Sequence, residues 1–465
     1  MKFKICLYLL LAAMLPAFNL FATHNRSGEI VYEKIGPLTV RAKVITFTKT
    51  SSVNADRDTL IIQWGDGSSE AIVRANGPGN PPQGEELPND VKYNIYVGVH
   101  TYAAEGIYII SMTDPNRNAG IINVNPPSSD NMPFHLQAMI NFLPEAAAST
   151  GSPVLLAPPI DIALVGQPYI HAANAFSASG DSIAYELIVP MQGLDLPVYN
   201  YSFPDEIGFN PDVTFSLDSV TGKLVWDAPQ VQGEYVVAIL IKFYQNGILV
   251  GTTLRDMMIW VGENLGPAPA LLLDTPEDVV LDVNVGETVT VHLQVNEPGP
   301  DQDVLELTST SGLYQVQSPA TFSTNISGNT GTGIFSWVVQ PEHIREQPYT
   351  VTFNAKNGPD GLADIKLVRF RAKTTVAAPL VPDVGLEYST YPNPTTGSLT
   401  FEWNMPVQKG SVHITDELGR GLRTIVLPDA ATRLTTDIST FLPGVYFAKI
   451  QSEGAVFKTV QFVKK

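Results

Sequence analysis

Short runs in which every second residue is apolar recur along most of the chain. In TVTVHLQV (288–295) apolar and polar residues alternate strictly, whereas EYVVAILIKFY (234–244) is apolar at nearly every position. The first pattern is typical of a strand with one buried face, and the second of a central strand buried on both faces. Clusters of Gly, Pro, Asn and Asp separate such runs by roughly 8–15 residues, and no long stretch has helical periodicity. The pattern predicts an all-β fold of tandem β-sandwiches.

Breaks in this alternation divide the chain. Segments rich in proline or small residues lie at 143–153, 261–270 and 374–385 and are typical of linkers. A chain of 465 residues has room for about three or four sandwich-sized domains. The predicted domains after the first 22 residues are 23–146, 150–262, 266–374 and 386–465.

The first 22 residues place two lysines before a short apolar run. Together with the small residue Ala22, this arrangement predicts a secretory signal peptide (1–22), cleaved between Ala22 and Thr23. Cys6, the only cysteine, would leave with the peptide, so we expect no disulfide, thiolate metal site or lipid-modified cysteine in the exported chain.

The net charge of the chain disfavours some classes of binding partner. The formal charge is −18, and it becomes −20 when Lys2 and Lys4 leave with the signal peptide. Such a negative field disfavours nucleic acid and anionic membrane surfaces. No later stretch approaches the roughly 20 apolar residues that span a bilayer, so we expect no transmembrane span.

The first predicted domain contains a tight turn, Trp64-Gly65-Asp66-Gly67, directly after an apolar strand. His100 and Tyr102 follow in a later strand pattern, which continues through Gly106 and Tyr108. These features resemble the polycystic-kidney-disease (PKD) type β-sandwich module. The flanks at 23–36 and 114–142 are similar to the N-terminal surface domain of Bacteroidetes gliding-associated proteins. We expect His100 and Asp66 to support the turn structurally, in preference to an acid–base pair.

The second predicted domain contains FSLDSVTGKLVWDAP (215–229), in which Thr221-Gly222 predicts a hairpin and Trp226 a core residue. It resembles the immunoglobulin-like or cadherin-like repeats of bacterial surface proteins, without the cadherin calcium motif. The third predicted domain is a sandwich by pattern alone.

No motif predicts catalysis. Gly180-Asp181-Ser182-Ile183 is close to an esterase block, but no histidine has an Asp three residues before it, so we interpret the block as a turn. The seven scattered histidines predict no zinc site. Asp114, Asn116 and Asn118 offer oxygen ligands, but their spacing departs from that of a calcium-binding loop. Whether this segment binds Ca²⁺ is left open, and no other cofactor is expected.

The last eighty residues carry several motifs in a fixed order. A Pro-Asn-Pro turn opens the block, Gly residues mark strand reversals, and the chain closes on two lysines. This order resembles the type A sorting domain of the type IX secretion system (T9SS), a small immunoglobulin-like sandwich. The resemblance assigns the sorting motif to Tyr391, Pro392, Asn393, Pro394, Gly397, Gly419, Gly444, Tyr446, Lys449, Lys464 and Lys465.

The resemblance implies two partners, the type IX translocon and a sortase that cuts within about 374–390, and in addition possible attachment to cell-surface lipopolysaccharide. We therefore expect a secreted or outer-surface protein, not an enzyme, that acts as an adhesin or structural interaction protein with an unknown protein or glycan ligand. A carbohydrate-binding scaffold, with tyrosines such as Tyr93, Tyr96, Tyr199 and Tyr201 as contacts, and a hydrolase with an unfamiliar site are the alternatives. The sequence leaves the ligand, the oligomeric state and the attachment of the product open.

Overall fold

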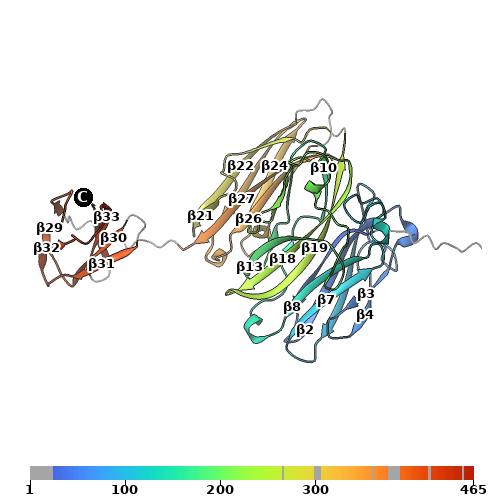
Figure 1. The fold of residues 1–465 in the computed structure, drawn as a ribbon, viewed down its shortest axis with the longest axis horizontal. Helices are drawn as coiled ribbons and strands as arrows, with labels where there is room; N and C mark the ends of the chain where they lie inside the picture. The colour runs from blue at the N-terminus through green and yellow to red at the C-terminus, as the bar shows by residue number, and fades with distance from the viewer. Residues whose placement is uncertain are drawn as a thin grey trace, which may run out of the picture. The chain divides into compact units, whose positions relative to one another are not determined.

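The computed structural model describes residues 25–263, 266–297, 305–358, 361–374, 388–416, 420–452 and 455–465. The chain forms two compact units, Met1–Thr374 and Thr375–Lys465, here called the large unit and the C-terminal unit. Strands make up both (Figure 1). The predicted signal peptide, including Ala22 and Thr23, lies outside the described residues.

The first part of the large unit contributes eight strands: β1 (Asn25–Lys34), β2 (Thr39–Lys49), β3 (Thr59–Gln63), β4 (Ser69–Val73), β5 (Glu85–Leu87), β6 (Val91–Thr101), β7 (Ile107–Asp114) and β8 (Phe134–Asn141). The middle part follows with β9 (Val154–Leu155), β10 (Ile160–Leu164), β11 (Tyr169–Ala172), β12 (Ala175–Phe176), β13 (Ser182–Ile188), β14 (Met191–Gly193), β15 (Leu196–Pro197), β16 (Phe215–Leu217), β17 (Lys223–Trp226), β18 (Gly233–Gln245) and β19 (Ile248–Gly262).

The last part of the large unit contains β20 (Ala270–Leu273), β21 (Val280–Asn284), β22 (Thr288–Asn296), β23 (Leu305–Ser311), β24 (Thr321–Ser327), β25 (Thr330–Val338), β26 (Tyr349–Asn357) and β27 (Ala363–Lys373). The C-terminal unit contains β28 (Tyr388–Tyr391), β29 (Ser398–Val407), β30 (Gly410–Asp416), β31 (Gly421–Val426), β32 (Ala431–Asp437), β33 (Gly444–Ser452) and β34 (Ala455–Lys464). Within the described residues the helical elements are single 3₁₀ turns: Val53–Ala55, Ser129–Asn131, Pro144–Ala146, Pro204–Glu206, Gly312–Tyr314 and Pro341–His343.

β19 joins the first and middle parts of the large unit. One edge of this strand pairs with β18, while the other edge pairs in turn with β8, β1 and β10. The result is a 12-stranded sheet whose main path is β4-β3-β7-β8-β19-β1-β2-β6-β5. The predicted domains 23–146 and 150–262 thus share a sheet, a difference from the sequence-based division. A strand that is apolar on both faces needs a layer on each side, and β19 obtains its layers from both segments.

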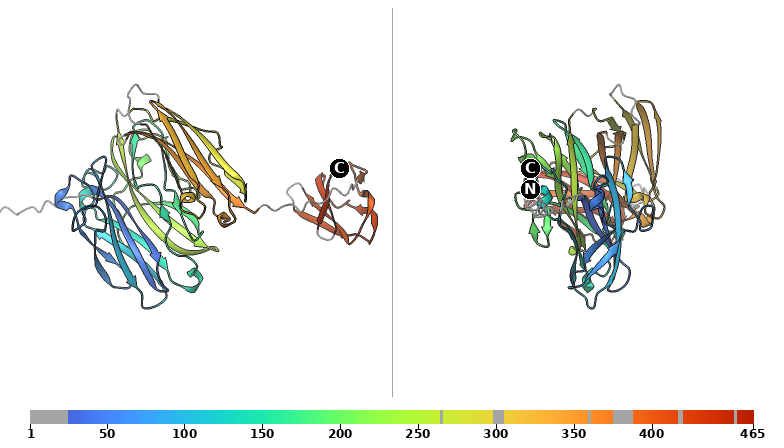
Figure 2. Two further views of the ribbon diagram at one scale, coloured as in Figure 1. Left: turned by 180° about the vertical axis from the view of Figure 1, so that it is seen from behind. Right: turned by 90° about the vertical axis from the view of Figure 1, so that its right-hand side faces the viewer.

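Side chains of both parts also share a core. Ile30, Trp64 and Leu136 from the first part pack in one cluster with Ile239 and Phe243 of β18. Farther along the same face of β18, Tyr235 and Val237 pack with Leu224 and Trp226 of the three-stranded sheet β11-β17-β16. The β18–β19 ribbon is the pair of long yellow-green strands in Figure 2. Trp226 is fully buried in this second cluster, and Gly222 turns the β16–β17 hairpin with a φ of +70°, so both predictions for this stretch are confirmed.

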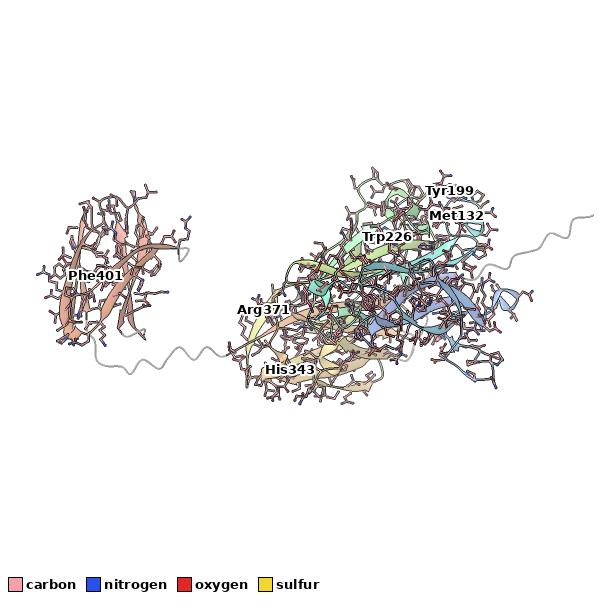
Figure 3. The ribbon with its side chains drawn as sticks, turned by 90° about the horizontal axis from the view of Figure 1, so that it is seen from below. Met132, Tyr199, Trp226, His343, Arg371 and Phe401 are labelled. Atoms are coloured by element: carbon pink, nitrogen blue, oxygen red, sulfur yellow. The ribbon has the colours of Figure 1, made fainter. Side chains whose placement is uncertain are left out.

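The last part of the large unit is a two-sheet sandwich. The sheets β20-β22-β25-β24 and β21-β27-β26-β23 enclose their own core, which includes Phe335, Trp337 and Phe353. Phe176 of β12 inserts into this core, the guanidinium of Arg345 lies 5.1 Å from the ring centroid of Phe176, and Arg345 Nη1 donates to Ser177 O over 3.1 Å. These contacts bind the sandwich to the middle part. Figure 3 labels Trp226 in the middle part and His343 in the sandwich.

The C-terminal unit is a smaller sandwich of a three-stranded sheet, β28-β29-β32, and a four-stranded sheet, β31-β30-β33-β34. Leu399, Phe401, Ile414 and Phe462 lie in its core. The predicted all-β fold is confirmed, and so is the small sandwich at the C-terminal end. No helix among the described residues is long and apolar enough to cross a membrane.

Candidate functional site

The turn after β3 is built around Asp66. Its Oδ1 accepts hydrogen bonds from Ser68 N (2.9 Å) and Ser68 Oγ (2.5 Å), while Oδ2 lies 2.7 Å from His100 Nε2 on β6. These partners, the Ser68 hydroxyl foremost, lower the pKa of Asp66 to about 2. Gly65 and Gly67 both have positive φ, and a Cβ on Gly65 would meet Ile109 N at 2.6 Å, so this turn requires glycine there.

Aromatic rings hold His100 in place. The imidazole stacks on Trp64 with centroids 4.9 Å apart, and Tyr102 meets it edge-on at 4.7 Å. Tyr102 OH donates to Trp64 O over 2.9 Å and thereby ties β6 to the turn. The structure thus brings the predicted turn residues into contact, and their packing stabilises the turn. His100 supports the carboxylate that organises the turn.

Two ion pairs lie buried where β19 meets the first part of the large unit. Arg117 donates to both Asp256 oxygens (3.0 and 2.7 Å), and both side chains are 0% exposed. Arg255 Nε donates to Glu29 Oε2 over 2.6 Å. Buried charges of this kind must be paired, so these bonds fix the 114–118 segment and β1 on β19. The sequence analysis missed both pairs, although Arg255 and Asp256 stand out as charges inside an apolar strand.

The three residues proposed as Ca²⁺ ligands, Asp114, Asn116 and Asn118, each form hydrogen bonds with a different partner. Asp114 pairs with Arg57 at 2.5 Å, Asn116 Nδ2 donates to Asp130 O at 2.6 Å, and Asn118 Nδ2 donates to Glu234. Among the described residues, no three His, Cys, Asp or Glu side chains are grouped so that they could hold a metal ion. Calcium binding stays a prediction.

The block Gly180-Asp181-Ser182 forms a turn into β13. Asp181 is buried, and its Oδ2 accepts hydrogen bonds from Ser177 Oγ and Ser179 Oγ, each over 2.7 Å. Ser182 is exposed at the first position of β13, where it pairs with Tyr244. The carboxylate therefore binds the turn that precedes it.

The six described histidines are all engaged in hydrogen bonds. His171 and His292 contact Asp161 and Asp274, His135 and His413 contact threonine hydroxyls, and His100 contacts Asp66. His343 is buried: Nδ1 accepts from Trp337 Nε1 (3.1 Å) and Gln340 N (2.9 Å), and Nε2 lies 2.8 Å from Gln317 O. This geometry requires the neutral tautomer that carries its proton on Nε2.

In the C-terminal unit, the Pro-Asn-Pro turn is joined to the last strand. Asn393 Oδ1 accepts from Val463 N (2.8 Å), and Asn393 Nδ2 donates to Gln461 O (3.2 Å). Thr395 N donates to Val463 O, and Lys465 N donates to Thr395 O, each over 2.9 Å. The two ends of the sorting motif thus form one structural element. Sequence reasoning placed both ends but did not predict that Asn393 connects them.

The other sorting residues lie around this junction and in β33. Tyr391, Pro392, Asn393 and Pro394 are exposed, and Tyr391 OH donates to Glu402 Oε2 over 2.5 Å. Gly397 O accepts from Ile438 N over 2.7 Å. Tyr446, two residues after Gly444 in β33, is buried, and its OH donates to Leu442 O over 2.6 Å. Gly419 lies outside the described residues.

The predicted cationic residues differ in exposure. Lys449 and Lys465 are exposed, whereas Lys464 is 7% exposed and its Nζ donates to Lys465 O. Lys449 and Lys465 therefore present their charge to solvent, while Lys464 also serves the packing of β34.

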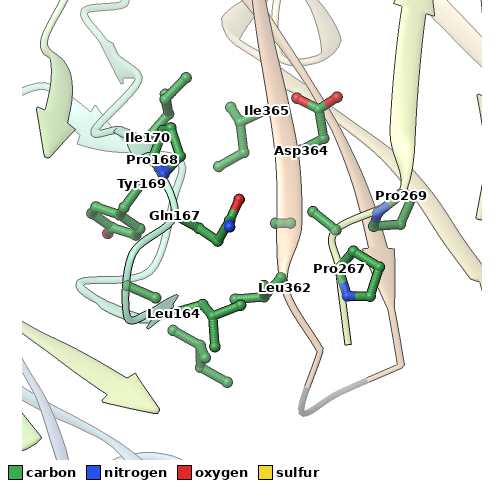
Figure 4. A pocket seen from close by; sticks show the side chains of 14 residues that line it. Leu164, Gln167, Pro168, Tyr169, Ile170, Pro267, Pro269, Leu362, Asp364 and Ile365 are labelled. Atoms are coloured by element: carbon green, nitrogen blue, oxygen red, sulfur yellow. The ribbon is translucent and has the colours of Figure 1, made fainter. Parts of the chain in front are cut away.

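The described residues of the large unit form several hollows, of which two concern possible binding sites. The smaller, of about 340 Å³, is bordered by the segment from β10 to β11 and by residues next to β20 and β27, with Leu164, Pro168 and Leu362 among its mostly apolar walls (Figure 4). The larger, of about 650 Å³, is a groove lined by Trp260, Glu234 and Arg26 among others. Sequence reasoning missed the groove, because its residues come from distant segments.

The four tyrosines suggested as glycan contacts differ in exposure. Tyr96 is 2% exposed and its OH donates to Arg57 O, and Tyr201 OH donates to Val236 O over 3.0 Å. Burial raises the pKa of Tyr201. Tyr93 is half-buried, and Tyr199 is 53% exposed near the edge of the molecule in Figure 3. The expectation that Tyr96 is exposed was wrong, because alternation does not show which face of a strand a second layer covers. Tyr201 is partly buried.

The β-sandwich fold, together with the contact between the Pro-Asn-Pro turn and the last strand, defines a modular β-sandwich protein with an export domain at its C-terminus. Residues 389–465 match the family of secretion system C-terminal sorting domains, which confirms the resemblance stated for the end of the chain. Such a domain marks a protein delivered by the type IX system to the medium or the outer cell surface.

Comparison with whole proteins adds less. No curated protein matches the chain. Among solved structures, the N-terminal eight immunoglobulin domains of Down syndrome cell adhesion molecule (DSCAM) align with 12% identity and a TM-score of 0.20 over 95% of this chain. The chain spans about half, 49%, of that structure's length.

Proposed function

We propose that the large unit is a non-catalytic binding body, an adhesin or structural interaction protein, which the C-terminal unit delivers to the cell exterior. The observation that carries the proposal is the joining of a sorting domain, 389–465, to a large unit whose parts are locked by β19 and buried ion pairs. Interlocked sheets hold surface loops in fixed positions, which favours binding over a reaction that needs moving parts.

The use of the titratable side chains supports a non-enzymatic role. The His–Asp pairs of the large unit serve turns and strand ends: His100 braces the Asp66 turn, and Asp274 accepts from the backbone N of His292 over 2.9 Å. A nucleophilic serine would need a histidine that is oriented toward it, and Ser182 lies on β13 with Asp181 bonded to other serines.

The test separates delivery from binding. A chain that lacks 389–465 is expected to stay inside a type IX-competent host, while the full chain reaches the medium or surface and carries a new C-terminus cut within about 374–390 by mass spectrometry. The purified full chain is then incubated with whole cells and with immobilised proteins and glycans. If the full chain binds neither cells, proteins nor glycans, the binding role is contradicted. If the shortened chain is delivered as efficiently as the full chain, the sorting role is contradicted.

A carbohydrate-binding scaffold is the second candidate, and the groove with Trp260 is the observation that favours it. A hydrolase is tested by an esterase, glycosidase and peptidase screen of the full chain, followed by Ser182→Ala if activity is found. The PKD-like and cadherin-like resemblances, the sortase and the attachment to lipopolysaccharide belong to the same proposal. They are supported by the motifs quoted above.

A further inference from the structure

The larger groove lies where all three parts of the large unit meet. Its walls come from the β5–β6 turn, from the segment before β10 and from the ends of β23 and β26, and its volume is about 650 Å³. Small-molecule sites usually measure ~300–1,000 Å³ and often lie between domains. The groove therefore has the size and position of a binding site.

The floor of the groove is one face of the β18–β19–β10 sheet. Glu234, Trp260 and Ile162 stand opposite one another on the three strands, and Met258 and Ile160 form the next row on the same face. All five line the groove. The floor is thus a flat apolar surface that has a carboxylate at one side.

Trp260 differs from the four other tryptophans. Those four are core residues with exposures of 0–3%, namely Trp64, Trp226, Trp337 and Trp403. Trp260 is only partly buried, and it lines the groove. Water contact with a large indole is costly, so this indole is suited to cover by a ligand with a flat apolar face.

Polar groups of both signs surround this indole. Arg26, with a side chain 8% exposed, is held by Asn89 O (3.0 Å) and lies 3.6 Å from Glu234, and its buried Nε has no partner within the described residues. Glu306, which also lines the groove, is exposed and pairs in register with Lys356 on β26. The groove therefore offers hydrogen-bond donors and acceptors around an apolar floor.

We propose that the groove binds a neutral saccharide unit, whose ring stacks on Trp260 and whose hydroxyls bond to Glu234, Glu306 and Arg26. The inference rests on the proposed binding role of the large unit. An anionic ligand would meet the net negative charge of the chain and the groove carboxylates, and a cation would meet Arg26 and Lys356. A wholly apolar ligand would desolvate these charges without hydrogen bonds. A sugar ring combines an apolar face, which can stack on the floor of the groove, with neutral donors and acceptors, which can form hydrogen bonds with the polar groups around it.

The experiment probes the full chain with an array of neutral glucans, mannans and chitin oligomers, followed by calorimetry with the best ligand. Trp260→Ala is expected to weaken binding about tenfold or more, and Glu306→Gln, an exposed and isosteric change, about threefold. Tyr199→Ala removes an exposed aromatic that does not line the groove and should leave the affinity unchanged. Circular dichroism of each variant verifies folding. Saccharide should also shift tryptophan fluorescence, and this shift should vanish in Trp260→Phe.

The outcomes separate the site from the general role. Saccharide binding that survives both Trp260→Ala and Glu306→Gln would overturn the groove as the site and leave the binding role intact. Blank arrays together with binding to a protein surface would overturn the saccharide class only. A chain that binds neither glycans, proteins nor cells would overturn the proposed function itself, and the groove assignment with it.

Discussion

A single carboxylate organises the Trp64–Gly67 turn, and its titration gives a prediction. Because the pKa of Asp66 falls from 3.8 to about 2 on folding, its ionised form stabilises the fold above pH 3.8, and this contribution disappears as the pH falls through about 2. Asp66→Asn should therefore lower the free energy of unfolding at pH 7 by about 1 kcal/mol or less, since the side chain is 25% exposed and partly screened.

Urea unfolding of the full chain and of Asp66→Asn between pH 7 and pH 2 measures this difference. The two curves should differ above about pH 4 and converge toward pH 2. Glu33→Gln, at an exposed surface pair with Arg41, is the control for removing one charge. A difference that grows as the solution is acidified would contradict the assigned direction of the pKa.

At this scale the sequence predicted the role of residues whose local pattern is distinctive. The glycines flanking Asp66 require positive φ, and the Trp-Gly-Asp-Gly order indicated the turn before any contact was known. Tyr96, which lies in β6 and is buried, shows the limit. Whether a tyrosine in a strand is exposed depends on a layer supplied by a distant segment, and no local pattern reports that segment.

At the scale of elements, β19 depends on a glycine, Gly251, where it passes between β8 and β18. A Cβ on Gly251 would overlap Tyr32 OH and the Phe243 ring, and both side chains belong to a packed core. Gly251→Ala should therefore destabilise the large unit by about 1–3 kcal/mol through overpacking. Thermal unfolding checks this, with Gly266→Ala as control because open space surrounds Gly266. Equal stability of the two variants would show that β19 can shift without cost.

β34 gives the second prediction at this scale. Asn393→Ala removes the acceptor for Val463 N and the donor to Gln461 O. The free energy of local opening at the end of β34 should therefore fall by about 1–2 kcal/mol. Hydrogen exchange of the full chain should show faster exchange at Val463 and Lys465, with Asn393→Asp intermediate because it keeps the acceptor. An unchanged rate at both amides would mean that Thr395 alone holds the strand.

For the whole molecule, strand positions could be predicted while the division into domains could not. The runs at 234–244 and 288–295 lie within β18 and β22 as expected, because alternation reports burial locally. The pairing of β19 with β8, β1 and β10 depends on register between segments far apart in the sequence, such as Gly28 and Asp256. The groove is unpredictable for the same reason, since Arg26, Trp260 and Glu306 meet only in the folded chain.

The shared sheet makes the first and middle parts of the large unit one cooperative structure. Arg117→Met leaves Asp256 buried without its partner, which should cost about 3–5 kcal/mol. Because the pair joins the 114–118 segment to β19, protection from hydrogen exchange should fall by the same free energy in β3 and in β17, on either side of the predicted boundary at 146–150. Peptides from β33 in the C-terminal unit should keep their protection and serve as the internal control. If β3 lost protection while β17 kept it, the two segments would be separate domains, and the shared sheet would not couple their stability.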